Sequence, residues 1–268
     1  MAVPPPVTSS APLSVEGLSV AYGERVAVER LSLTVRPGEI YGLLGSNGAG
    51  KTSTIKAVVG LVRPTAGEIR VFGVDALRDS LAVKARLGYV PETSMLYEAL
   101  TPREFLEFVA SVRGMDAATA TRRMQSYAEA FRLEAEVEEP IATLSNGTRQ
   151  KVLIIAALLH SPPLLVLDEP LNSLDPRSVR IMKDVLRRYV ATGGRGVLFS
   201  THTMEVAEQL CSRVGILDRG VLRGEGTLAG LRERVAAGES SLEEIFLRLT
   251  EEDVGVRAAV DSLGDPSV

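Results

Sequence analysis

The sequence is poor in cysteine and aromatic residues and carries no strong charge of either sign. Its 268 residues include one cysteine, Cys211, two histidines and no tryptophan, and the formal net charge is -4. A single cysteine excludes an internal disulfide and favours a reducing cytoplasm, so we expect Cys211 to be a small buried hydrophobic residue. The modest charge gives no indication of nucleic acid as a partner.

Long apolar runs and targeting segments are also missing. The longest apolar run, VLIIAALL at 152–159, is far shorter than the roughly 18 residues that a membrane span needs. The stretch MAVPPPVTSSAP has neither the basic region nor the apolar core of a signal peptide, and it predicts a disordered arm over residues 1–12. Any role at a membrane would therefore need a partner subunit.

Strand patterns and helix patterns alternate along most of the chain. LSVEGLSVAYG and LSLTV alternate apolar and polar residues, and IYGLLG runs into glycines, which indicates strands. Over residues 101–133 helical spacing replaces this pattern, with Phe105, Phe108, Val109 and Val112 repeating at helical intervals. The strands LLVLD, GVLFS and VGILD then alternate with helices, which is typical of a parallel sheet with crossover helices.

These patterns together predict an α/β fold with a mixed sheet. We expect antiparallel strands at the N-terminus, a parallel central sheet and an inserted helical subdomain at about residues 92–162. The folded domain is assigned to residues 13–250, in which SLEEIFLRLT forms a short amphipathic helix near the end, and residues 251–268 form a C-terminal tail.

GSNGAGKT, at residues 45–52, matches the G-x-x-x-x-G-K-[ST] pattern of a phosphate-binding loop. It follows a predicted buried strand and precedes a predicted helix, which is the context that the pattern requires. Glycines let backbone amides surround phosphate oxygens, and a helix N-terminus favours negative charge. Lys51 would contact the β- and γ-phosphates of ATP and Thr52 would hold Mg²⁺, so the motif predicts a P-loop NTPase core. The candidate nucleotide-binding residues here are Gly45, Ser46, Asn47, Gly48, Ala49, Gly50, Lys51, Thr52 and Ser53.

Other chemical groups follow predicted strands. Asp168 and Glu169 end the apolar strand in LLVLDEP, where Asp168 is the candidate metal ligand and Glu169 the candidate to polarise the attacking water. His202 follows GVLFS, and it would contact the γ-phosphate, brace Glu169 or simply cap a helix. Tyr22, at the end of a strand, would stack on adenine or pack on a half-exposed sheet.

The order of these motifs resembles that of the nucleotide-binding subunits of ATP-binding cassette (ABC) transporters. GSNGAGKT together with LSNGTRQK … LLVLDEPLNSLDP carries the resemblance, which covers roughly residues 13–250. It implies an adenine-stacking role for Tyr22, a switch role for His202 and contact across a dimer by NSLD, residues 172–175. It also implies that two subunits, identical or different, pack head to tail around two ATP molecules. The residues it adds to the site are Ser145, Asn146, Gly147 and Asp175.

Two positions differ from the commonest pattern of that family. The signature segment, residues 144–148, reads LSNGT where Leu-Ser-Gly-Gly-Gln is usual, and Glu92 in GYVPE stands where glutamine is usual. Asparagine tolerates positive φ and caps helices, so Asn146 need not disrupt the loop. Glu92 can still bind Mg²⁺ but adds negative charge. Both departures are similar to those of drug- and antibiotic-export members.

The resemblance implies an ATPase that powers export through a separate transmembrane permease subunit at the cytoplasmic face of the membrane. Met95, Leu96 and Tyr97 are predicted to line a groove for a short permease helix, although packing inside the helical subdomain explains them nearly as well. A soluble family member, an importer subunit and a regulatory ATP binder without hydrolysis remain alternatives. The intact Asp168–Glu169 pair argues against the last.

Overall fold

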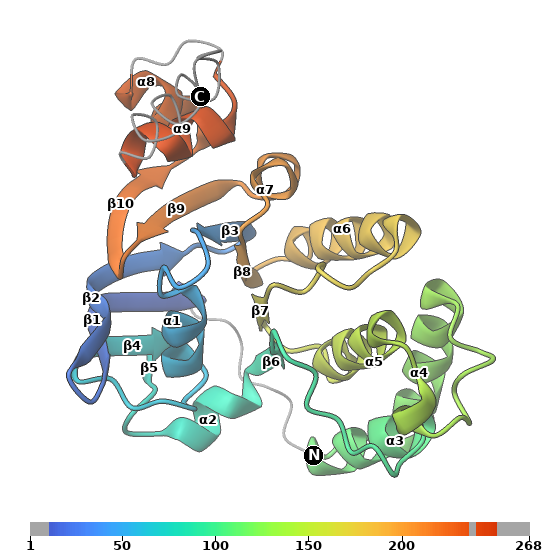
Figure 1. Cartoon of the computed structure of the whole chain (residues 1–268). Helices are drawn as coiled ribbons and strands as arrows, with labels where there is room; N and C mark the ends of the chain where they lie inside the picture. The colour runs from blue at the N-terminus through green and yellow to red at the C-terminus, as the bar shows by residue number, and fades with distance from the viewer. Residues whose placement is uncertain (1–10, 236–239, 251–268) are drawn as a thin grey trace.

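The computed structural model describes residues 11–235 and 240–250 of the chain, in two sheets with helices around them (Figure 1). Most of the predicted arm and all of the predicted tail lie outside these residues. Within the described part, no helix is long and apolar enough to cross a bilayer.

The first sheet is antiparallel and has the order β2-β1-β4-β5. Its strands are β1 (Leu13–Tyr22), β2 (Arg25–Val35), β4 (Ala66–Val71) and β5 (Val74–Asp75). In β1, Val15 and Leu18 are both buried although they are an odd number of residues apart. The register of β1 against β2 shifts between them, and Gly17 there has a φ of 59°. This bulge absorbs one residue, so both halves of the strand face the core.

The second sheet has the order β10-β9-β3-β8-β7-β6 and is parallel except between β9 and β10. Its strands are β3 (Glu39–Leu44), β6 (Leu87–Val90), β7 (Leu164–Asp168), β8 (Gly196–Thr201), β9 (Arg213–Asp218) and β10 (Val221–Gly226). In β7, Leu165 and Leu167 join one hydrophobic cluster while Leu164 and Val166 join another. The sheet is therefore buried on both faces, and its strands are apolar throughout.

The helices fall into groups that Figure 1 separates clearly. They are α1 (Lys51–Val58), α2 (Ser80–Ala85), α3 (Pro102–Val112), α4 (Ala117–Phe131), the short 3-10 helix η1 (Ile141–Thr143), α5 (Asn146–Leu159), α6 (Pro176–Ala191), α7 (Met204–Leu210), α8 (Leu228–Arg234) and α9 (Leu242–Leu249). The helices α3, α4 and α5 gather on the side of the molecule away from the antiparallel sheet. We retain about residues 92–162 as the proposed limits of this helical subdomain, and 13–250 as those of the domain.

Helix α3 shows how the predicted apolar spacing is used. Thr101 and Glu104 form a reciprocal capping box at its start, as the entry pattern predicts. Phe105 is buried, but the side chains of Phe108 and Val112 are 49% and 69% exposed. The buried face of α3 includes Leu106 and Ala110, so Phe108 and Val112 lie at its edge. The helix is confirmed, but its apolar spacing does not place every apolar residue in the core.

Candidate active site

The phosphate-binding loop connects the carboxyl end of β3 to the N-terminus of α1. Gly50 is the N-cap of α1 and has a φ of 110°, which non-glycine residues rarely adopt. A Cβ atom at Gly50 would lie 2.6 Å from the Ala27 carbonyl oxygen. Glycine is thus required both by conformation and by the close approach of β2.

A cavity of about 350 Å³ lies against this loop. That volume is at the lower end of the range for small-molecule sites, roughly 300–1,000 Å³. Its lining residues are Tyr22, Arg25, Ala27, Asn47, Gly48, Gly50, Lys51, Thr52, Ser53, Glu92 and Glu169. Sequence reasoning missed Arg25 and Ala27. Arg25 pairs with Tyr22 across the β1–β2 turn, so pairing within this hairpin is the signal that could have identified it.

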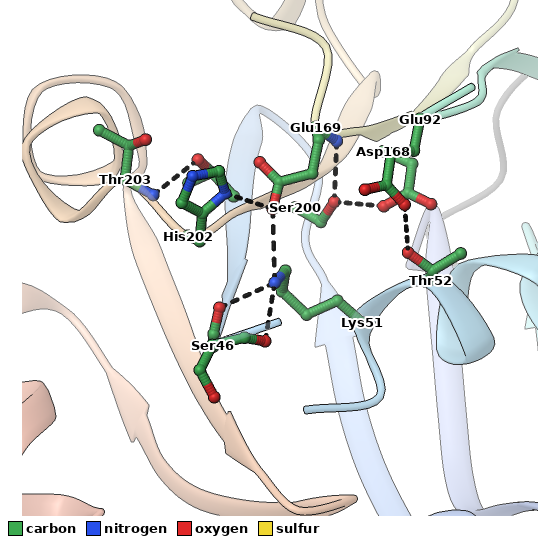
Figure 2. Close-up of polar contacts among 11 residues, drawn as sticks. Ser46, Lys51, Thr52, Glu92, Asp168, Glu169, Ser200, His202 and Thr203 are labelled. Atoms are coloured by element: carbon green, nitrogen blue, oxygen red, sulfur yellow. Dashed lines mark hydrogen bonds and ion pairs between the residues drawn. The ribbon is translucent and has the colours of Figure 1, made fainter. Parts of the chain in front are cut away.

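Three titratable side chains form a row in which Glu169 lies between Lys51 and His202 (Figure 2). Glu169 Oε1 lies 3.3 Å from Lys51 Nζ and 3.0 Å from His202 Nδ1. Lys51 also donates hydrogen bonds to the carbonyl oxygens of Gly45 at 2.7 Å and Ser46 at 3.2 Å. The side chains of Lys51 and Glu169 are buried, where charge interactions are stronger than in water. Of the roles considered for His202, the structure therefore shows the contact with Glu169.

A second set of oxygen atoms lies next to this row. The Asp168 carboxylate, at the end of β7, accepts a hydrogen bond from Ser200 Oγ at 2.7 Å. Burial raises the pKa of Asp168, while the hydrogen bond from the Ser200 hydroxyl lowers it in part. Thr52 Oγ1 donates to Glu92 Oε2 at 3.2 Å. Figure 2 shows Thr52, Glu92 and Asp168 converging on one place.

The oxygen atoms of this second set are suitable ligands for Mg²⁺. Asp168 Oδ2 is buried and accepts no hydrogen bond from any described residue, which leaves a carboxylate oxygen for a cation. Magnesium prefers hard oxygen ligands and usually takes one or two carboxylates together with substrate phosphates and waters. The described residues hold no cluster of three or more His, Cys, Asp or Glu side chains that would cage a metal by themselves.

The signature segment lies at the N-terminus of α5. Ser145 is the N-cap, and its hydroxyl accepts a hydrogen bond from the Thr148 amide at 3.2 Å. Asn146 is the first helical residue, so it does not use the tolerance for positive φ that we considered for it. A Cβ atom at Gly147 would lie 2.6 Å from the Ser173 carbonyl oxygen. Glycine at 147 therefore lets α5 approach the loop at 172–175.

Asp175 makes its side-chain contacts within its own chain. Its carboxylate caps α6 by accepting hydrogen bonds from the Ser178 amide at 3.0 Å and the Ser178 hydroxyl at 2.6 Å. Lys151 Nζ lies 3.2 Å from the same carboxylate. The Ser178 hydrogen bonds, helped by Lys151, hold the pKa of Asp175 well below its usual range. None of the residues 145–147 or 175 lines the cavity at the phosphate-binding loop.

The loop between β6 and α3 divides the predicted groove residues. Met95 and Tyr97 are 81% and 62% exposed, whereas Leu96 packs against the hydrophobic cluster of the helical subdomain. The contacts of Leu96 favour the alternative of packing inside the helical subdomain, whereas the groove remains a prediction for Met95 and Tyr97.

Known proteins match the chain over most of its length. The family model described as ABC transporter matches residues 28–172. The chain belongs to the ABC transporter family. It is 37% identical over 243 residues to the Bacillus subtilis ABC-type transporter ATP-binding protein EcsA, covering 91% of this chain and 98% of that protein. It is 38% identical over 216 residues to Nod factor export ATP-binding protein I of Ralstonia nicotianae, covering 81% and 67%.

Solved structures agree with this assignment. An ATP-binding subunit of an ABC transporter superposes with a TM-score of 0.85 at 35% identity, covering 90% of this chain and 100% of that one. A dimeric ATP-binding cassette in a post-hydrolysis state, bound to ADP and Pi, has a TM-score of 0.71 at 23% identity, covering 81% and 98%, and shows the shared fold. The predicted α/β fold with a P-loop NTPase core is confirmed, and the chain is an ATP-binding ABC ATPase.

Proposed function

We propose that this ABC ATPase hydrolyses Mg-ATP at a head-to-tail dimer interface and so powers substrate export through a separate transmembrane permease subunit. The observation that carries the proposal is the row of Lys51, Glu169 and His202 beside the phosphate-binding loop. This row contains a cation for the phosphates, a carboxylate for the attacking water and a histidine that orients the carboxylate.

The chemistry is phosphoryl transfer to water, in which positioning and charge stabilisation do most of the catalysis. The phosphate-binding loop and Lys51 hold the phosphates of ATP. Lys51 and His202 contact Glu169 Oε1, whereas Glu169 Oε2 has no hydrogen-bond partner among the described residues. Glu169 is thereby held in one orientation with an oxygen free to accept a hydrogen bond from water, as a general base requires.

Thr52, Glu92 and Asp168 are the residues that would hold Mg²⁺. When bound, Mg²⁺ neutralises charge on the phosphate oxygens. Glu92 places a second carboxylate beside Asp168 in this set, and nearby negative charge contributes to raising the pKa of Asp168. The extra carboxylate makes metal binding more sensitive to the total charge of the site.

The dimer is proposed because the signature segment and the phosphate-binding loop do not share a cavity within one chain. In a head-to-tail pair, Ser145, Asn146 and Gly147 at the N-terminus of α5 would face the γ-phosphate of ATP held by the other subunit. A helix N-terminus is a suitable site for such an anion. Tyr22 would stack on the adenine of the ATP held by its own chain.

Export is proposed from the relatives, since one of them is named for Nod factor export. A permease would bind at the apolar side chains exposed next to the helical subdomain, which would hold the ATPase at the cytoplasmic face of the membrane. An importer subunit and a soluble ATPase are the alternatives. Co-purification with a membrane protein, followed by transport assays in vesicles, would separate these alternatives. An importer would move its substrate in the opposite direction, and no permease would co-purify with a soluble ATPase.

The site is tested by Glu169→Gln. We expect the rate of phosphate release to fall at least about a hundredfold, which is the typical contribution of a general base, while ATP binding persists and ATP-bound dimers accumulate. Phosphate release and size-exclusion chromatography measure the two effects. Glu129→Gln, an equal change on the exposed surface of α4, is the control. Hydrolysis at the parent rate by Glu169→Gln would rule out Glu169 as the general base.

A further inference from the structure

Ser200, on β8, connects the Asp168 carboxylate to the Glu169 backbone amide at the carboxyl end of β7. It is fully buried, and in the parallel register its neighbours are Leu43 on β3 and Asp168 on β7. Its hydroxyl donates a hydrogen bond to Asp168 Oδ1 at 2.7 Å and accepts one from the Glu169 amide at 3.0 Å. Figure 2 shows the hydroxyl bridging the two residues.

The Glu169 end of this bridge holds an unusual backbone conformation. Glu169 has a φ of 46°, in the left-handed region that few non-glycine residues adopt. Such conformations persist where surrounding contacts determine them. The hydrogen bond to Ser200 fixes the amide at the point where the chain leaves β7, so it controls the direction in which the Glu169 side chain points toward Lys51 and His202.

At the Asp168 end of the bridge, the Ser200 hydroxyl bonds to only one of the two carboxylate oxygens. With Oδ1 bound to Ser200, Oδ2 is left buried without a hydrogen-bond partner among the described residues. A ligating carboxylate is commonly oriented by a neighbouring hydrogen-bond donor of this kind. The bridge therefore turns one defined oxygen of Asp168 toward the place where Thr52 and Glu92 converge.

We propose that Ser200 is a positioning residue for ATP hydrolysis, which fixes the Mg²⁺-binding orientation of Asp168 and the backbone of Glu169 with a single hydroxyl. A hydroxyl is suited to this task because it donates one hydrogen bond and accepts others at the same time. Alanine makes neither bond, and cysteine is only a weak donor and acceptor. The inference rests on the proposed roles of Asp168 and Glu169, to which it adds the residue that connects them.

The test uses the full chain with Ser200→Ala, and it separates metal binding from nucleotide binding. Without Mg²⁺, we expect the Kd of a fluorescent ATP analogue to stay within about twofold of the parent value, because Ser200 does not line the cavity. In a Mg²⁺ titration of the same binding signal, the half-saturating Mg²⁺ concentration should rise about tenfold or more, as for lost partners of metal ligands. The kcat should fall by a similar factor, with little change in the KM for ATP.

Two further variants control for folding. Ser200→Thr keeps the hydroxyl and suits a strand, so it should restore much of the Mg²⁺ affinity. Thr250→Val removes another buried hydroxyl, one that bonds to the Phe246 carbonyl far from the site, and should change neither measurement. If Ser200→Ala does not fold, Ser200→Thr and Ser200→Cys give the comparison, with weaker Mg²⁺ binding expected in the cysteine variant alone.

Several results would overturn the inference. One is a folded Ser200→Ala variant with parent Mg²⁺ half-saturation and kcat, and another is an equal loss of nucleotide binding with and without Mg²⁺, which would make Ser200 a structural residue only. Equal Mg²⁺ binding by the threonine and cysteine variants would also count against it. A parent chain that releases no phosphate from Mg-ATP would instead contradict the proposed function, so the two failures are distinguishable.

Discussion

Glu169 combines a strained backbone with a buried charge. Its left-handed φ of 46° costs on the order of 1–3 kcal/mol for a non-glycine residue. Three contacts offset this cost: the amide bonds to Ser200, and Oε1 lies within ion-pair distance of Lys51 and His202. Since Lys51 begins α1 while Ser200 and His202 lie at the carboxyl end of β8, the conformation depends on the assembled sheet edge. The strain is thus located at the residue on which the proposed chemistry depends.

Cys211 represents the opposite case, a residue with reactive chemistry that the fold suppresses. Burial raises the pKa of its thiol to about 12, and the sulfur lies so close to β3 that a Cβ at Gly42 would come within 2.8 Å of it. Because the thiolate is the reactive form, we expect little reaction with a thiol reagent at pH 8 to 9 in the native chain, and full reaction after denaturation.

A matched control places the thiol on the neighbouring exposed residue. Ser212→Cys in a Cys211→Ser background should react promptly under native conditions, because residue 212 is exposed. The sign of the pH effect follows from the shift. The protonated thiol is favoured in the folded chain, so its contribution to stability is complete below the ordinary pKa of about 9 and is lost as the pH rises toward 12. Prompt native reaction of Cys211 would contradict the assignment.

At the scale of elements, α5 and the loop that follows β7 are joined in one unit. Gln150 Nε2 donates to the Pro170 carbonyl oxygen at 3.2 Å, and Lys151 Nζ lies 3.2 Å from Asp175. Gly147 lies so close to the Ser173 backbone that a side chain at position 147 would not fit. The signature segment and the loop at 172–175 therefore cannot move independently without breaking these bonds, which couples two segments that the proposed dimer places near the interface.

The variant Lys151→Ala tests this coupling. The ion pair is partly exposed, so its loss should lower stability by only about 0.5–1 kcal/mol. We expect a larger effect on turnover: kcat should fall about three- to tenfold, while the KM for ATP stays within about twofold, since Lys151 does not line the cavity. Steady-state phosphate release and thermal unfolding measure both quantities, and Lys151→Arg, which keeps the charge, should be close to the parent. Unchanged kcat with lowered stability would assign the pair a structural role alone.

The elements also show what the sequence can predict. The phosphate-binding loop and Asp168–Glu169 are runs of consecutive residues, and the long strands and helices carry regular apolar periods, so both could be predicted. The short α2 and β5 contain too few residues to establish a period, and β10, VLRGEG, has only two apolar residues before its polar residues and glycines. Ser200 could not be identified, because its role depends on the register that sets β8 beside Asp168. The Lys151–Asp175 pair likewise depends on tertiary packing.

At the scale of the whole molecule, the two faces of the parallel sheet pack against different parts of the structure. One face of the sheet packs against α1 and the antiparallel sheet, and the other packs against α3, α4, α5 and α6. On the helical side, Met95, Tyr97, Phe108 and Val112 keep large apolar surfaces exposed. The Tyr97 ring stands edge-on to Phe108 with centroids 6.0 Å apart, so these two residues form an exposed apolar patch, and Val112 follows Phe108 one turn later on α3. Exposed apolar patches mark interaction sites.

This patch is where the proposed permease contact can be tested, with the variant Tyr97→Glu. A charge on the patch should release the ATPase from membranes that contain the permease and reduce transport at least about tenfold, because a buried unpaired carboxylate is costly at an apolar interface. The ATPase activity of the isolated chain should stay within about twofold, since Tyr97 is 62% exposed and outside the cavity. Leu61→Glu, a change at a 63% exposed leucine beyond the end of α1, is the control. Full transport and membrane retention by a stable Tyr97→Glu variant would exclude the patch as the docking site.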